Sequence, residues 1–253
     1  MIGIFDSGSG GLTVLHAIRE VLPSADVVYF GDIKNAPYGG KSHEELSKLT
    51  VHSLKLLRKR GATNLVSACN SVSASLALSI FDAFDIAPTQ MIEMVGPTAS
   101  YFRGSDARIL LCATVATIAS GIYQNAFDML DLQIQTVAIP ALAGAIEFGK
   151  SPDELRTIIA EAFAPVDFSG VDVLVLGCTH YPLALEIFKE VVPSTIDIFD
   201  PALAVAERVE KKFWPQESGM GTTTFLISKE SAPFRAFVER LFPNMHYTLE
   251  VVE

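Results

Sequence analysis

Two stretches of this sequence, Ser67-Ala68-Cys69-Asn70-Ser71 and Gly177-Cys178-Thr179-His180-Tyr181-Pro182, decide how the rest of the chain is interpreted. Each follows apolar residues typical of a buried strand, and each precedes a segment with apolar residues at helical spacing. We therefore expect each cysteine where a strand ends and a helix begins, the edge at which α/β sheets bind ligands. The positive end of a helix should lower the pKa of each thiol there.

Strands and helices are predicted to alternate along the whole chain. Besides the strands that lead to Cys69 and Cys178, the sequence predicts strands at 2–5, 27–30, 108–112, 132–139, 196–199 and 223–227. Helical spacing predicts helices at 12–22, 42–60, 71–84, 141–148, 152–163, 181–192, 201–213 and 234–241, and a turn plus a helix over 114–130. This alternation is typical of an α/β fold, in which helices cover both faces of mostly parallel sheets.

The sequence also carries a weak internal repeat. The residues that lead to Cys69 resemble those that lead to Cys178, and Ile2-Gly3-Ile4-Phe5 resembles Ile109-Leu110-Leu111-Cys112 at a similar spacing. Such a repeat indicates two related, pseudo-symmetric α/β halves that meet over one cleft. We predict a first domain of residues 1–95 and 205–253 and a second of residues 96–204. Gly96-Pro97 interrupts a mostly apolar segment, and we expect the chain to cross to the second domain there.

Composition limits the classes of function. The net charge of −10 argues against general nucleic-acid binding, which needs a basic face. No apolar run is long enough for a membrane-spanning helix, and three cysteines do not make a disulfide framework in 253 residues. The N-terminus reaches Asp6 without the basic segment of a secretory signal. We expect a cytoplasmic protein with no membrane or nucleic-acid partner and no N-terminal regulatory extension.

The glycine-rich segment Asp6-Ser7-Gly8-Ser9-Gly10-Gly11 follows the first predicted strand. It lacks the Gly-Lys-Ser/Thr ending of a P-loop, and Thr13 stands where a dinucleotide-binding motif needs its third glycine. Two interpretations stay open at this point: a plain tight turn, or a turn that places Asp6 in a functional site at the strand end.

The three cysteines are interpreted differently. Cys112 lies in the middle of a predicted strand, and we expect it to be a core residue. Cys69 and Cys178 precede polar residues that can cap a helix or bind a ligand carboxylate. A metal site built from both cysteines with His180 and Asp6 is disfavoured, because no Cys-x-x-Cys pair is present. A nucleophilic cysteine with a histidine base would leave the second cysteine unexplained.

Taken together, these motifs resemble the cofactor-independent aspartate/glutamate racemase family, and within it the glutamate racemases. The matching blocks follow one another through most of the chain: Asp6-Ser7-Gly8 with Gly10-Gly11, Gly31-Asp32, Pro37-Tyr38-Gly39, Ala68-Cys69-Asn70-Ser71, Ala113-Thr114 with Ala116-Thr117, Glu147, and Gly177-Cys178-Thr179-His180-Tyr181-Pro182-Leu183. His180 favours glutamate, since the related aspartate racemases tend to carry Glu at that position.

The resemblance implies two α/β domains with the active site between them, no cofactor, and supply of D-glutamate for bacterial peptidoglycan. It implies that Cys69 and Cys178 are catalytic and that Asp6, Glu147 and His180 assist them. The implied substrate-binding residues are Asp6, Ser7, Pro37, Tyr38, Gly39, Asn70, Ser71, Thr114, Thr117, Thr179 and His180. The expected partner is the small-molecule substrate glutamate, and a homodimer stays open.

Racemisation removes the α-proton from one face of the substrate and returns a proton to the other face. Two bases on opposite faces achieve this without turning the substrate over. In this hypothesis Cys69 as thiolate takes the proton while Cys178 as thiol supplies the replacement, and the reverse reaction exchanges the roles. The alternatives are an aspartate or hydantoin racemase of the same fold, and a non-catalytic module that binds an acidic metabolite.

Overall fold

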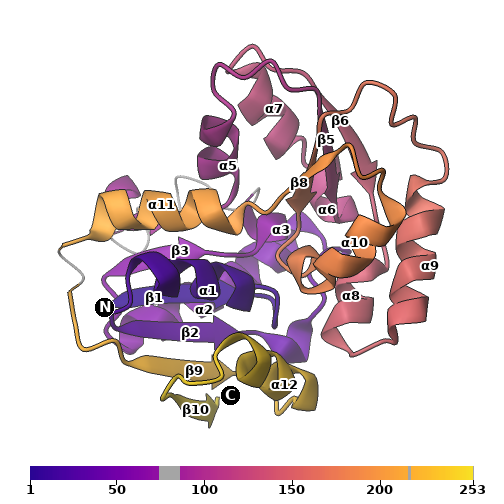
Figure 1. Cartoon of the computed structure of the whole chain (residues 1–253). Coiled ribbons are helices and arrows are strands. Elements are labelled where there is room, and N and C mark those ends of the chain that lie inside the picture. Colours follow the sequence, from indigo (N-terminus) through magenta and orange to yellow (C-terminus); the bar gives the residue numbers. More distant parts are fainter. Residues whose placement is uncertain (74–85, 216–217, 253) are drawn as a thin grey trace.

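Two parallel sheets form the framework of the molecule (Figure 1). The structure is a computed structural model that describes residues 1–73, 86–215 and 218–252. The strand order is β10-β9-β2-β1-β3-β4 in the first sheet and β6-β5-β7-β8 in the second. All of these neighbouring strands pair in parallel, which confirms the predicted α/β class.

The first sheet contains both ends of the chain. Its strands are β1 (Ile2–Asp6), β2 (Val27–Gly31), β3 (Asn64–Ser67), β4 (Met91–Ile92), β9 (Thr223–Ile227) and β10 (Thr248–Val251). One face packs against α1 (Leu12–Val21), α11 (Ala202–Phe213) and α12 (Ala232–Leu241), and the other against α2 (His43–Lys59). Alternate residues of each strand therefore enter different cores: Ile4 packs with α1, whereas its neighbour Phe5 packs with α2.

The second sheet is built from the middle of the chain. Its strands are β5 (Ile109–Ala113), β6 (Ile134–Ala138), β7 (Val173–Gly177) and β8 (Asp197–Phe199). One face is covered by α8 (Leu142–Glu147), α9 (Pro152–Phe163) and α10 (Leu185–Val191), and the other by α5 (Val95–Tyr101) and α7 (Ile122–Asp128). Cys112 is fully buried in β5, which confirms that it is a core residue.

The two sheets share one connectivity. The order β2-β1-β3-β4 recurs as β6-β5-β7-β8, so the weak sequence repeat relates strands with equivalent places: β1 with β5, and β3 with β7. Cys69 follows β3 and Cys178 follows β7, and the two cysteines are therefore topological equivalents. The boundaries predicted for the two domains stay a prediction.

Gly96-Pro97, where the chain is predicted to cross between domains, lies in the first turn of α5, between β4 of the first sheet and β5 of the second. The crossing between domains stays a prediction. Proline is tolerated there, since the first N–H groups of a helix have no partner inside the helix. The side chain of Glu93 accepts hydrogen bonds from the N–H groups of Val95 and Gly96, at 2.6 Å each, and so holds this end of α5.

Several predicted helices differ in extent. The turn and helix expected over 114–130 are two short helices, α6 (Val115–Ala119) and α7, separated by Gly121 at a left-handed φ of +67°. The helix expected at 181–192 starts as the 3₁₀ turn η3 (Tyr181–Ala184) before α10. Of the helix expected at 71–84, only α3 (Asn70–Ser73) is described, and residues 74–84 lie outside the described part. No helix within the described residues could span a membrane.

Candidate active site

Cys69 and Cys178 line the same small cavity between the two sheets. The other lining residues are Ser7, Pro37, Tyr38, Gly39, Asn70, Ser71, Thr114, Ala143, Thr179 and His180. Only 5% and 6% of the two cysteines is exposed. The enclosed space is about 10 Å³, roughly enough for one water molecule, so its walls must separate before a larger ligand can enter.

His180 and Glu147 form a buried ion pair beside Cys178. His180 Nε2 lies 2.6 Å from Glu147 Oε2, and His180 Nδ1 lies 3.9 Å from Cys178 Sγ. Burial disfavours the imidazolium, but hydrogen bonds to Cys178 and Glu147 raise the pKa of His180 well above its ordinary value. Burial likewise opposes the carboxylate, but His180 and Ser9 lower the pKa of Glu147. The imidazolium can therefore stabilise a thiolate at Cys178.

The surroundings of Cys69 have the opposite effect. Burial, followed by the charge of Asp6 and then by Cys178, raises the pKa of the Cys69 thiol well above its ordinary value. The expected lowering of this pKa by the start of α3 is therefore wrong for Cys69. The cause is that desolvation and a nearby carboxylate outweigh the hydrogen bonds that favour the thiolate, which come from Val72 and Ser7.

Asp6 lies at the end of β1 and contacts the cavity-lining Thr179. It is fully buried and accepts hydrogen bonds from the N–H groups of Gly8 at 3.2 Å and Gly11 at 2.9 Å. The hydroxyl of Thr179 donates to its second oxygen at 3.2 Å, which links the first sheet to the Cys178 segment. Burial raises the pKa of Asp6, although the charge of His180 acts against this shift.

The glycine-rich turn at 6–11 lies directly against the buried pair of His180 and Glu147. A Cβ at Gly8 would lie 2.5 Å from Glu147 Oε2, and one at Gly10 would lie 2.5 Å from His180 Nδ1 and from Thr179 Oγ1. Both distances are far shorter than an ordinary contact, so the glycines are what allow this approach. Of the two interpretations left open for the turn, a role for Asp6 in a functional site stays a prediction, and its carboxylate accepts from the cavity-lining Thr179.

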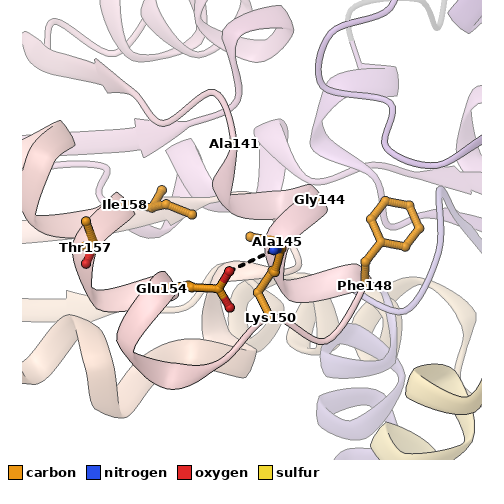
Figure 2. Close-up of a pocket in the computed structure, with 8 residues that line it drawn as sticks. All are labelled: Ala141, Gly144, Ala145, Phe148, Lys150, Glu154, Thr157 and Ile158. Atoms are coloured by element: carbon orange, nitrogen blue, oxygen red, sulfur yellow. Dashed lines mark hydrogen bonds and ion pairs between the residues drawn. The ribbon is translucent and has the colours of Figure 1, made fainter.

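Glu147 reaches the interior because α8 has two unlike faces. Leu142, Ala143, Ile146 and Glu147 are buried, whereas Ala141, Ala145 and Phe148 line an open apolar groove shared with α9 (Figure 2). This groove, of about 500 Å³, is much larger than the cavity between the cysteines. It contains the exposed Lys150–Glu154 ion pair and no cysteine or histidine, so its size does not make it the chemical site.

Hydroxyl and amide groups gather on one wall of the cavity. Ser71 Oγ lies 2.9 Å from Thr114 Oγ1 and 3.3 Å from Thr117 Oγ1. Asn70 Oδ1 accepts a hydrogen bond from the Tyr123 hydroxyl at 2.5 Å. Within the described part of the chain, Asn70 Nδ2 is a buried donor without a partner. A ligand carboxylate could accept from this donor and from the hydroxyls.

The loop that carries Pro37, Tyr38 and Gly39 into the cavity wall is held by a buried carboxylate, Asp32. Tyr38 donates its hydroxyl hydrogen to Asp32 Oδ2 at 2.6 Å, and Asp32 also accepts from Ser228 at 2.7 Å and from Asn35. A Cβ at Gly39 would lie 2.7 Å from Thr114 Cβ, so this loop also meets the second sheet through a glycine.

A family model described as Asp/Glu/Hydantoin racemase matches residues 11–209. The chain belongs to this racemase family. A glutamate racemase of Koribacter versatilis is 35% identical, covering 88% of this chain and 79% of that protein. One from Pseudomonas paraeruginosa is 32% identical, covering 99% and 93%. The crystal structure of glutamate racemase isoform RacE1 from Bacillus anthracis is 27% identical with a TM-score of 0.88, and covers 100% of this chain and 97% of that chain.

A second solved relative in the racemase family is the Francisella tularensis glutamate racemase in complex with D-glutamate. It is 26% identical with a TM-score of 0.86, and the match covers 100% of this chain and 97% of that chain. The fold that was expected from the sequence resemblance is therefore the fold of solved family members.

The structure brings all the predicted site residues of this racemase-family chain into one region. Eleven of them line the cavity: Ser7, Pro37, Tyr38, Gly39, Cys69, Asn70, Ser71, Thr114, Cys178, Thr179 and His180. Asp6, Glu147 and Thr117 lie just behind and are hydrogen-bonded to lining residues. Three supporting residues, Ser9, Asp32 and Tyr123, were not predicted to be in the site. Ser9 and Asp32 lay within quoted motifs, whereas no pattern marked Tyr123.

Proposed function

We propose that the protein interconverts L-glutamate and D-glutamate, with Cys69 and Cys178 as the two acid/base groups. The supporting observation is that these cysteines follow equivalent strands and line one cavity. Donors suited to a carboxylate stand on the cavity wall, and an acidic group, Asp6, lies behind it where it can attract the substrate ammonium.

The reaction begins when a cysteine thiolate removes the α-proton. The proton joins the sulfur, and the electron pair of the broken C–H bond moves onto the α-carbon and its carboxylate. The opposite thiol then gives its proton to the other face and becomes the thiolate. Positioned acid/base groups contribute about 10²–10⁴-fold to such a transfer, and the remainder must come from stabilising the negative charge. Asn70, Ser71 and Thr114 supply donors for it.

The two thiolates would be stabilised in different ways. At Cys178 the imidazolium of His180, itself paired with Glu147, is already in place. At Cys69 burial, and next the charge of Asp6, oppose the thiolate, and the substrate ammonium would offset the charge of Asp6. Substrate binding would thus activate Cys69, and closure of the walls would exclude water and strengthen each electrostatic contact.

The test is deuterium incorporation at Cα when the protein is incubated with L- or D-glutamate in D2O, followed by proton NMR and a chiral assay. We expect exchange with inversion for glutamate, slower or no exchange for aspartate and hydantoins, and loss of racemisation in Cys69→Ala and Cys178→Ala. Wild-type racemisation by either variant would contradict the two-cysteine assignment. Glutamate binding without any exchange would indicate a binding module instead.

We extend the proposal to biological context. D-Glutamate made here would supply peptidoglycan synthesis, and the expected location is the cytoplasm. Residues 1–95 with 205–253, and 96–204, are proposed as the two units that separate to admit substrate. Whether the protein forms a homodimer stays a prediction that sedimentation or light scattering would decide.

A further inference from the structure

Ser9 is the residue through which the first sheet holds the catalytic ion pair of the second. It lies in the turn after β1 and is fully buried. Its N–H donates to Glu147 Oε2 at 2.7 Å, and its hydroxyl donates to Glu147 Oε1 at 3.1 Å. Both carboxylate oxygens are therefore bound by a residue that lies 138 positions away in the sequence.

We infer that Ser9 is a positioning residue for the Cys178 half-reaction: it fixes the Glu147 carboxylate, which in turn holds His180 beside the sulfur. The contacts form one continuous chain, from Ser9 Oγ to Glu147 Oε1, and from Glu147 Oε2 to His180 Nε2, whose other ring nitrogen faces Cys178. The anchoring itself stands on these contacts, whereas its effect on turnover rests on the proposed function.

The hydroxyl has a specific task in this chain. Glu147 Oε2 contacts both the Ser9 N–H and His180 Nε2. Among the described residues, the hydrogen-bond donor to Glu147 Oε1 is the Ser9 hydroxyl. Without it, a buried carboxylate oxygen loses its donor and the carboxylate can rotate. Loss of a hydrogen bond to a buried charged group changes the equilibrium or rate constant that depends on it by roughly 10- to 100-fold.

Charged and titratable groups face Glu147 from three other elements. They are His180 ahead of η3, Asp6 at the end of β1 and Tyr29 in β2. His180 favours the carboxylate, whereas Asp6 as carboxylate opposes it. Ser9 hydrogen bonds lower the pKa of Glu147, so their partial loss must move its titration to higher pH.

The experiment is a double-mutant cycle of Ser9→Ala, Glu147→Gln and the two combined, with kcat measured across pH by deuterium exchange. Ser9→Ala should lower kcat roughly 10- to 100-fold and move the acid limb of the kcat profile to higher pH. Because Ser9 acts through Glu147, the double variant should be no slower than Glu147→Gln alone.

Two further variants serve as controls. Ser53→Ala removes another fully buried serine hydroxyl, one that donates to Leu49 O within α2, and should leave kcat unchanged. Ser9→Thr keeps the hydroxyl, and its kcat should stay close to that of the wild type. It therefore tests the inference even if Ser9→Ala folds poorly. The inference is overturned if Ser9→Ala matches Ser53→Ala, if Ser9→Thr is as slow as Ser9→Ala, or if the effects of Ser9→Ala and Glu147→Gln multiply in full.

A second readout separates this inference from the proposed function. The side-chain carboxyl of Glu147 can be titrated by ¹³C NMR in the wild type and in Ser9→Ala, without any turnover. A wild-type protein that does not exchange the glutamate α-proton would contradict only the proposed function. In that case, a Glu147 titration that moves to higher pH in Ser9→Ala supports the anchor, and an unmoved titration overturns it.

Discussion

Gly10→Ala tests directly whether the glycine-rich turn sets the position of His180. A Cβ at Gly10 would lie 2.5 Å from His180 Nδ1 and from Thr179 Oγ1, and 2.8 Å from the backbone nitrogen of His180. An ordinary contact begins at 3.4 Å, so the turn and the side chains that it faces must separate by about 0.9 Å. Rotation of a side chain cannot relieve the backbone contact.

A displacement of about 1 Å in a catalytic group costs about 100-fold in rate. We therefore expect kcat for α-proton exchange to fall by about 100-fold in Gly10→Ala, with the free energy of unfolding lowered by about 1–3 kcal/mol. Proton NMR in D2O, starting from each enantiomer, measures the rate. Urea unfolding measures the stability and shows whether the variant is folded under the assay conditions.

Gly40→Ala is the matched control. In the described part of the chain, no heavy atom other than those of Gly40 and its two chain neighbours lies within 4 Å of a Cβ at Gly40, and its φ is not left-handed. Its kcat and stability should stay close to those of the wild type. If folded Gly10→Ala exchanges the α-proton as fast as Gly40→Ala, the argument that the turn positions His180 is refuted.

Three further outcomes follow from the buried contacts. Tyr123→Phe removes the hydroxyl that donates to Asn70 Oδ1, and it should raise KM for glutamate by about tenfold with a smaller change in kcat. An unchanged KM would contradict a role for Asn70 in binding. The pKa of Glu147 is lowered, so its charged pair with His180 contributes stability above about pH 4.5 that is lost as the pH falls through the folded pKa of Glu147. Urea unfolding should therefore show that the free energy of unfolding by which the wild type exceeds Glu147→Gln becomes smaller in acid. A difference that does not change with pH would contradict the charged pair. The pKa of Cys69 is raised, so its thiol should react slowly with iodoacetamide at neutral pH and faster as the pH rises. Mass spectrometry of the alkylated peptide measures the reaction. Rapid labelling at neutral pH would show a preformed thiolate and contradict the raised pKa.

Local patterns in the sequence were sufficient to place both cysteines correctly. A short apolar run followed by polar residues defines the end of a buried parallel strand, and β3 and β7 end just before Cys69 and Cys178. Such patterns do not fix the local conformation at Gly96-Pro97, because a glycine and a proline that interrupt an apolar run also suit the first turn of a helix, as in α5.

Long-range contacts account for the rest of what the sequence did not reveal. The pKa of Cys69 depends on burial and on Asp6, both of which arise only when the two sheets come together. In the sequence, Ser9 is a small residue in a glycine-rich turn and carries no further signal. Its contact with the Glu147 carboxylate, far along the chain, arises only in the folded structure. Strand β10, with mostly exposed residues, carries too weak an apolar pattern to be recognised.

The unlike partners of the two thiols have a thermodynamic consequence. L- and D-glutamate have equal free energies in water, so the Haldane relationship requires equal kcat/KM in the two directions whatever the protein does. In the proposed mechanism Asp6 opposes one thiolate and the His180–Glu147 pair supports the other, so the two bound states, one for each enantiomer, differ in free energy. The ratio of the two kcat values equals the equilibrium constant between these bound states, and KM differs by the same factor, so that the mirror-image substrates saturate the protein at different concentrations.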